Sequence, residues 1–261
     1  MVEFDIVIPA RYASTCLPGK PLRDVAGKTL IQRVYECAIK SRASQVIVAT
    51  DDDAIMRVAE DFGAIVVMTS KHHDSGTDRL AEVVQRLNVP DDRIIVNLQG
   101  DEPLVPAQLI HQVAEGLAGD DRASIATVCK EVRRQRDYTD PSVVKVVMSR
   151  DGYALYFSRA PIPWARQHDG LPSRWPPKPG RVYHHIGMYA YRAAYLRRFA
   201  ALESCELEQV EKLEQLRALW NGEAIRVLKA YCLPGPGVDT IYDLENVIRI
   251  FERQQEAEHD Q

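Results

Sequence analysis

The stretch IVIPARYASTCLPGKPL, residues 6–22, determines how the first half of the chain is interpreted. An apolar strand over Phe4–Ile8 stops at Pro9, and the loop after it carries Arg11, Ser14, Gly19 and Lys20. Fixed cations and free backbone N–H groups at the C-terminal end of a strand suit a polyphosphate. The alternative interpretation is an ordinary surface turn with two solvated charges.

The residues that follow alternate between helical and strand-like patterns. Apolar runs predict strands over 46–49, 65–68 and 94–98, and helical spacing predicts helices over 30–39, 51–62, 77–87 and 106–117. Such alternation predicts an α/β fold with a mostly parallel central sheet and helices on both faces. Ligands of such sheets gather at the C-terminal ends of the strands.

The pattern changes after about Ala123. We predict strands over 143–148, 153–157 and 187–191, and helices over 193–201, 206–220 and 241–251. The helix over 206–220 is expected to bury a stripe formed by Leu207, Val210, Leu213, Leu216 and Trp220. Prolines, glycines and charges predict a long excursion over 165–181. The chain is therefore interpreted as one domain, 1–261, with a β-rich inserted subdomain at about 125–205 closing over the ligand site.

The composition of the chain argues against several classes of protein. The 261 residues carry a formal net charge of −4 with a pI near 6.0, which argues against a general nucleic-acid binder. No run approaches the ~20 apolar residues of a membrane helix, and the N-terminus has no signal-peptide pattern. Five cysteines are scattered without a C-x-x-C pair, which favours a reducing cytoplasm over a disulfide framework or a zinc site.

Two carboxylates are candidate metal ligands. Asp101 lies in the segment LQGDEP directly after a predicted strand, and a strand-end carboxylate suits Mg²⁺, whose remaining ligands come from substrate phosphates and water. A plain Gly-Asp turn is the alternative. Asp239 is either a second metal ligand or an N-cap of the last helix, and its pattern favours the cap.

The segment Ser75-Gly76-Thr77 opens a predicted helix. Its N–H groups are placed to meet a nucleobase or a phosphate, although Ser75 or Thr77 is equally a simple helix cap. The pairs His72-His73 and His184-His185 lack metal-ligand spacing, and each is expected to have one exposed and one structural ring.

Taken in order, these motifs make the chain resemble the 3-deoxy-manno-octulosonate cytidylyltransferase family along nearly its whole length. The resemblance lies in IPARYAST, LPGKPL, VATDD, SGTDRLAEV, VNLQGDEPL, VVKVV, YALYFSRAPIPW, HIGMYAYR, LEQLRALW and GVDT. It implies a Rossmann-like nucleotidyltransferase fold. It also implies a Mg²⁺-dependent enzyme of lipopolysaccharide assembly that joins CTP to the acid sugar Kdo, releases pyrophosphate and forms homodimers.

The resemblance also implies roles for particular residues. Arg11 and Lys20 would hold the triphosphate, and Asp101 and Asp239 would bind Mg²⁺. Nucleotide contacts would come from Ala10, Ser75, Gly76 and Arg79. The acid-sugar pocket would be lined by Gln99, Arg159, His185, Tyr189, Glu214 and Gln215.

One position departs from the family pattern. The family has an arginine of the phosphate-holding loop where this chain has Cys16. A thiol cannot replace a guanidinium, so reduced affinity for CTP is expected. Two other functions stay open: a cytidylyltransferase for another acid sugar, such as 8-amino-Kdo or a sialic acid, and a weakened CTP-binding protein.

Overall fold

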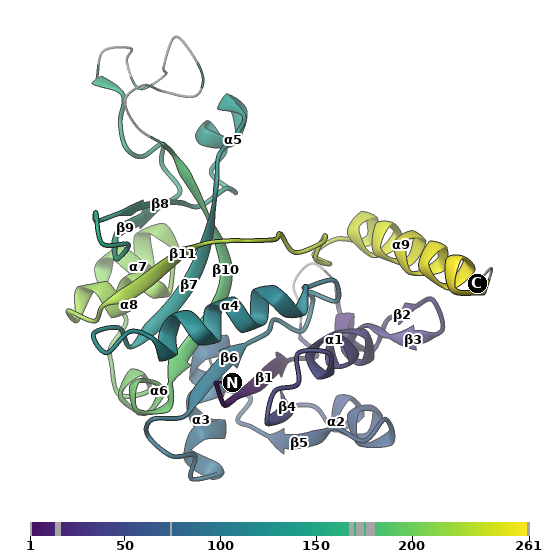
Figure 1. The fold of residues 1–261 in the computed structure, drawn as a ribbon. Coiled ribbons are helices and arrows are strands. Elements are labelled where there is room, and N and C mark those ends of the chain that lie inside the picture. The colour runs from purple at the N-terminus through teal and green to yellow at the C-terminus, as the bar shows by residue number, and fades with distance from the viewer. Residues whose placement is uncertain are drawn as a thin grey trace.

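A single large sheet organises the molecule. The structure is a computed structural model that describes residues 2–13, 17–73, 75–166, 170, 175 and 181–259. Along the sheet the strands run in the order β11-β7-β10-β6-β1-β4-β5, and β8 and β9 join it beside β10 (Figure 1). Of the described strands on that path, β10 alone runs against the others. The predicted mostly parallel sheet is confirmed.

The strands have the following bounds: β1 Phe4–Ala10, β4 Gln45–Thr50, β5 Ile65–Met68, β6 Ile94–Asn97, β7 Ile125–Glu131, β8 Lys145–Met148, β9 Ala154–Ser158, β10 Tyr183–Arg192 and β11 Ile225–Lys229. A separate hairpin pairs β2 (Asp24–Val25) with β3 (Lys28–Thr29). The helices are η1 Lys20–Leu22, α1 Leu30–Ile39, α2 Asp53–Asp61, α3 Gly76–Arg86, α4 Ala107–Ala118, α5 Gln135–Thr139, α6 Ala193–Phe199, α7 Glu206–Glu211, α8 Gln215–Trp220 and α9 Ile241–His259.

The central strand β1 is buried on both faces. Its alternating side chains supply Ile6 and Ile8 to one core and Val7 to the other. Helices α1, α2 and α4 cover the first core, and α3, α6 and α8 cover the second. The predicted coverage of both faces is therefore confirmed. The parallel strands β1, β4 and β6 bring their C-terminal ends to one edge, where the first candidate loop begins.

The stretch expected to form an inserted subdomain supplies strands of the main sheet. Both β7 and β10 lie within it, and β10 extends over ten residues where a short strand at 187–191 was predicted. Its extra N-terminal residues pair with β7 and β8. A strand with neighbours on both edges is lengthened by pairing that a local apolar pattern does not reveal. Most of the predicted excursion over 165–181 lies outside the described residues.

The predicted helix over 206–220 is wrong as a single element. Lys212, with φ of 53°, interrupts it and separates α7 from α8. The proposed core stripe is also wrong in part, because Val210 and Trp220 are 83% and 57% exposed. Leu207, Leu213 and Leu216 still pack in the second core. The left-handed residue interrupts the helical period between them, and Val210 and Trp220 stay outside that core.

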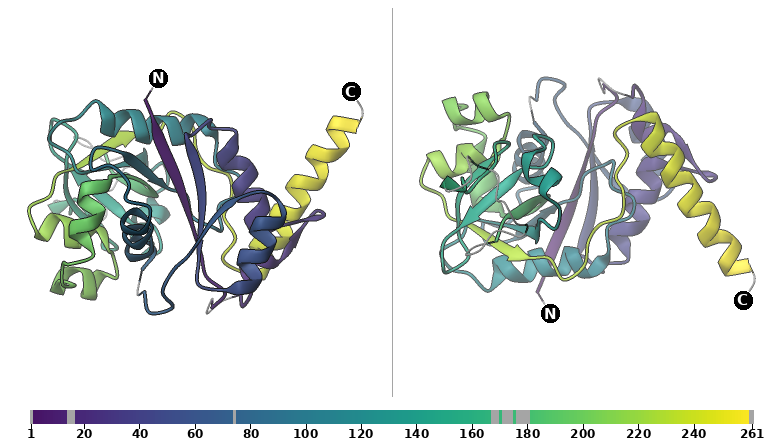
Figure 2. Two further views of the ribbon diagram at one scale, coloured as in Figure 1. Left: turned by 90° about the horizontal axis from the view of Figure 1, so that it is seen from below. Right: turned by 90° about the horizontal axis from the view of Figure 1, so that it is seen from above.

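The C-terminal helix returns to the first half of the chain. From β11 the backbone crosses the strand ends, and α9 then lies beside the N-terminal elements (Figure 2). Leu244 and Val247 of α9 form a third core with Val25 and Leu30. This return brings Asp239, two residues before the start of α9, to the strand ends. Within the described part of the chain, no helix combines the length and apolarity needed to cross a membrane.

Candidate active site

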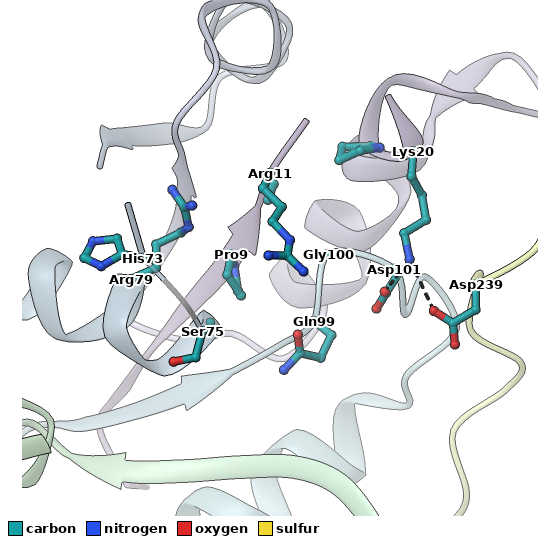
Figure 3. Close-up of a pocket in the computed structure, with 13 residues that line it drawn as sticks. Pro9, Arg11, Lys20, His73, Ser75, Arg79, Gln99, Gly100, Asp101 and Asp239 are labelled. Carbon is teal, nitrogen blue, oxygen red and sulfur yellow. Dashed lines mark hydrogen bonds and ion pairs between the residues drawn. The ribbon is translucent and has the colours of Figure 1, made fainter. Parts of the chain in front are cut away.

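A cleft of about 330 Å³ lies at the C-terminal ends of β1 and β6 (Figure 3). Nine residues singled out from the sequence line it: Ala10, Arg11, Lys20, Ser75, Gly76, Arg79, Gln99, Asp101 and Asp239. They come from four separate segments of the chain. The expectation that these segments meet at one sheet edge is therefore met by their placement, whereas the role of each residue is a matter for the proposal below.

Lys20 joins the two candidate metal carboxylates. Its Nζ atom donates to Asp101 Oδ2 at 2.7 Å, to the carbonyl of Val238 at 2.8 Å and to Asp239 Oδ1 at 3.3 Å (Figure 3). Burial by itself lowers the pKa of Lys20, but the bonds and charges of Asp101 and Asp239 outweigh it and raise that pKa. Asp101 and Asp239 thus face the same cation, and Lys20 remains charged.

Asp239 does not cap the last helix. Thr240 and Asp243 form that cap, because Asp243 Oδ2 accepts from the Thr240 N–H and hydroxyl, each at 2.8 Å, and Asp243 N–H donates to Thr240 Oγ1 at 3.2 Å. The N–H of Asp239 also donates to Asp243, at 3.2 Å. The cap interpretation of Asp239 is therefore wrong, and its carboxylate is left to face Lys20.

Two neighbours of Asp101 complete this side of the cleft. A Cβ atom at Gly100 would lie 2.7 Å from the carbonyl oxygen of Pro9, so any side chain there would push apart the ends of β1 and β6. Burial raises the pKa of Glu102 to about 7, and repulsion from Asp101 and then Asp239 contributes. Glu102 gave no sequence signal of its own, because its environment is created by the return of Asp239.

The N-terminus of α3 forms the opposite wall. Ser75 Oγ accepts the N–H of Asp78 at 3.1 Å, so Ser75 is a helix cap and lines the cleft at the same time. The N-terminal end of a helix attracts anions through its free N–H groups and its dipole. Arg79 also lines the cleft, but its Nη2 atom is paired with Asp51 at 2.7 Å.

His73, one member of the pair His72-His73, lines the cleft, although the sequence did not predict it as a site residue. It lies in the wall, and its Nε2 atom is 2.5 Å from Glu82 Oε2. Its neighbour His72 is exposed, as was expected of one member of the pair. Nearness to Ser75 was the available signal for His73. Cys16 and Ser14 lie outside the described residues.

A group of polar side chains, here called the polar cluster, adjoins the cleft. Its members are Thr77, Asn97, His185, Tyr189, Tyr191 and Glu214. Tyr189 of β10 is in register with Asn97, two residues before Gln99, and the rings of Tyr189 and His185 lie 5.3 Å apart. The Thr77 hydroxyl donates to Glu214. Burial lowers the pKa of His185 to about 3, so this ring is neutral at pH 7.

Two buried polar atoms lack a partner among the described residues, one at the end of β6 opposite Tyr189 and one in the residue that follows Glu214. Gln215 Nε2 and Asn97 Oδ1 make no hydrogen bond within the described part of the chain. Because unpaired buried polar atoms cost free energy, such atoms beside a cleft indicate a polar ligand. Asn97 is a residue that sequence analysis missed, since it ends an apolar strand and carries no motif.

Arg159 lies apart from the lining of the cleft. Its guanidinium donates to the backbone carbonyls of Glu211 and Pro141, at 2.8 and 3.0 Å. It therefore reaches the turn between α7 and α8, which precedes Glu214 and Gln215. Of the six residues expected in the acid-sugar pocket, Gln99 lines the cleft, and His185, Tyr189, Glu214 and Gln215 belong to or adjoin the polar cluster.

Comparison with known proteins shows the family of the chain. A model of the cytidylyltransferase family matches residues 6–225. The 3-deoxy-manno-octulosonate cytidylyltransferases of Nitrosococcus oceani and Halorhodospira halophila are 50% and 52% identical. These alignments cover 97% and 94% of this chain and 98% and 96% of the relatives.

Solved structures give the same result. A CMP:2-keto-3-deoxy-manno-octonic acid synthetase in complex with CTP superposes with a TM-score of 0.87 at 40% identity, covering 97% of this chain and 99% of that one. A cytidylyltransferase from Leptospira borgpetersenii, 16% identical with a TM-score of 0.57 and coverage of 98% and 96%, shares the fold alone. The fold is therefore the predicted nucleotidyltransferase fold, and the chain belongs to the 3-deoxy-manno-octulosonate cytidylyltransferase family.

Proposed function

We propose that this chain transfers the cytidylyl group of CTP to 3-deoxy-manno-octulosonate (Kdo) and releases pyrophosphate, a reaction of lipopolysaccharide assembly. The observation that carries the proposal is the convergence of Lys20 with Asp101 and Asp239 in a cleft that adjoins a buried polar cluster. One region suits a triphosphate and the other suits a polyhydroxylated acid. Membership of the family supports the same substrates.

The nucleotide half would be held by fixed positive charge. Arg11 projects into the cleft from the end of β1 (Figure 3), and Ser75 and Gly76 present the N-terminus of α3 across from it. These groups would bind the phosphates and the nucleoside. Lys20 would stabilise the negative charge that develops on the departing pyrophosphate.

Mg²⁺ fits the donor set of this cleft. The ion takes oxygen ligands and is commonly bound by one or two carboxylates together with substrate phosphates. Asp101 and Asp239 supply two carboxylates that face one cation, Lys20 Nζ. These two residues would hold the metal, which would neutralise phosphate charge and lower the pKa of the attacking hydroxyl. Lys20 would then exchange its carboxylate partners for phosphate oxygens.

The acid sugar would occupy the polar cluster. Its hydroxyl groups would pair with Gln215 Nε2 and Asn97 Oδ1, and Gln99, His185, Tyr189 and Glu214 would complete the pocket. The neutral His185 ring offers one donor and one acceptor, and its Nε2 atom lies 2.9 Å from Thr127 Oγ1. Some N–H groups of the Arg159 guanidinium are not bonded to the carbonyls of Glu211 and Pro141. These groups would bind the carboxylate of the sugar.

The chemical step is an in-line displacement. The anomeric hydroxyl oxygen of Kdo forms a bond to the α-phosphorus of CTP, the bond from that phosphorus to the bridging oxygen breaks, and pyrophosphate leaves with the electron pair. The hydroxyl proton is lost to solvent. Positioning and charge neutralisation supply most of the acceleration in such a reaction.

The test is release of pyrophosphate from CTP by the full-length chain with Mg²⁺ and Kdo, repeated without Mg²⁺ and with 8-amino-Kdo and a sialic acid. Release that needs both Mg²⁺ and Kdo is expected. Faster release with another acid sugar would reassign the substrate. Binding of CTP with no release for any sugar would make the chain a nucleotide-binding protein weakened at Cys16.

The proposal extends to assembly and location. We infer a homodimer in the cytoplasm, with residues 125–205 as the contact region and as a sugar-binding subdomain. The mass of the particle in solution, measured by light scattering, tests the dimer. A monomer at the concentration used in the assay would contradict it.

A further inference from the structure

Arg159, the residue that follows β9, is held at both polar groups of its backbone. Arg159 N–H donates to Glu211 Oε2 at 2.9 Å, and Lys145 Nζ donates to the Arg159 carbonyl at 2.6 Å. Lys145 is fully buried on β8 and also donates to the carbonyl of Asp140, at 2.9 Å. With the side chain bonded to carbonyls as well, Arg159 has little freedom to move.

Glu211 is the centre of this arrangement. Its Oε1 atom accepts the Ser158 hydroxyl at 2.5 Å, while Oε2 accepts Arg159 N–H. The Tyr156 hydroxyl also bonds to it: burial first, and then the charge and the bond of Glu211, raise the pKa of Tyr156. One carboxylate therefore receives three donors, two from the end of β9 and one from Arg159 directly after it.

Glu211 lies at the turn between α7 and α8, so these bonds hold that turn. It is the final residue of α7, Lys212 after it is left-handed, and Glu214 and Gln215 open α8. The backbone carbonyl of Glu211 accepts Arg159 Nε at 2.8 Å. Glu211 thus binds Arg159 with its side chain and with its backbone, and it fixes the turn that carries Glu214 and Gln215 against β9.

We propose that Glu211 is a positioning residue for the acid sugar. It does not line the cleft, and it joins the two segments that supply Arg159 on one side and Glu214 with Gln215 on the other. Its effect is directed to the sugar, because the nucleotide side of the cleft is formed by β1, α3 and the strand-end loops. This proposal rests on the proposed transfer to Kdo.

The chemistry at Glu211 requires a carboxylate. Glutamine in its place keeps one acceptor oxygen and turns an NH₂ group towards either the Arg159 N–H or Ser158. At Arg159 two donors would face each other. At Ser158 the hydroxyl would have to accept the NH₂ group, and its own proton would lose the acceptor that Glu211 Oε1 provides. A buried donor without an acceptor is costly enough to move the segment that carries it. Small displacements of the groups that orient a substrate reduce binding or activity on the order of 10- to 100-fold.

The experiment compares steady-state KM values for Kdo and for CTP in the wild-type chain, E211Q and S158A, with Glu206→Gln as the matched control. Glu206 is exposed on the same short helix. We expect E211Q to raise KM for Kdo about tenfold or more and to leave KM for CTP within about twofold. In E206Q both KM values should equal those of the wild type. S158A removes one donor and keeps the carboxylate, so the same split is expected at a smaller size.

The outcomes separate the two proposals. An unchanged KM for Kdo in E211Q, or equal increases for both substrates, overturns the positioning role. If E211Q does not fold, S158A decides the question by the same split. A wild-type chain that releases no pyrophosphate with Kdo defeats the proposed function and with it this inference, whereas an active wild type with no split defeats the inference alone.

Discussion

The hydroxyl of Thr77 donates a hydrogen bond to the carboxylate of Glu214, although 137 residues separate them. Thr77 belongs to the first turn of α3, which lines the nucleotide side of the cleft through Ser75 and Gly76. Glu214 directly precedes α8 beside the polar cluster. One contact therefore connects the segment that would meet CTP with the segment that would meet the sugar.

Replacing Thr77 with valine tests this connection. The valine keeps the shape and loses the donor, so the partly buried Glu214 loses a partner. Leaving such an acceptor without its hydrogen bond costs about 1–3 kcal/mol. We expect KM for Kdo to rise about tenfold and KM for CTP to rise less. T139V, at an exposed threonine on α5, is the control. Equal changes in the two KM values would contradict the prediction.

Lys20 is expected to be indispensable for the chemical step. K20M removes the cation that contacts both carboxylates and that would balance the leaving group, so kcat should fall by about 10²- to 10³-fold. Lys28 is a matched control, because it is a partly exposed lysine paired with Glu36 on α1. K28M should leave kcat unchanged. Retention of wild-type kcat in K20M would remove Lys20 from the mechanism.

The raised pKa of Glu102 predicts that the stability of the fold depends on pH in an unusual direction. Its pKa is raised from 4.5 to about 7, so between these values the folded chain holds a proton that the unfolded chain has released. The free energy of unfolding therefore falls as pH rises through this window, by about 3 kcal/mol at most. E102Q cannot ionise and should be more stable than wild type above pH 7.

The measurement is chemical denaturation of E102Q and wild type without Mg²⁺ at pH 4.5, 6 and 8. The advantage of E102Q should grow with pH across this series. A constant difference, or one that shrinks with rising pH, would show that Glu102 is ionised throughout the range.

Cys16 is expected to weaken the use of CTP compared with the arginine of the family. Restoring the family arginine adds a cation to a loop that must neutralise several phosphate charges, so C16R should raise kcat/KM for CTP. Steady-state kinetics of C16R beside the parent chain checks this. No gain in kcat/KM would mean that Arg11, Lys20 and the end of α3 already neutralise the triphosphate.

The sequence predicted most of the sheet and the cleft because both follow local rules. Apolar runs of the right length fix the parallel strands, and loops at strand ends carry the polar residues. The interruption at Lys212 could not be predicted, since the segment 206–220 has helical composition throughout and its break is stabilised by bonds from Glu211 to β9. Asp239 was ambiguous for a similar reason, because only the Thr240–Asp243 cap decides its direction.

The sequence by itself determined the α/β architecture, the family and the identity of the charged residues at the strand ends. Tertiary structure alone decided that Lys20 lies between Asp101 and Asp239, that Glu102 titrates near neutral pH, and that Glu211 holds Arg159. Local pattern governs which residues enter strands, helices and loops. Charge and hydrogen bonding between segments far apart in the chain depend on distances that exist only after folding.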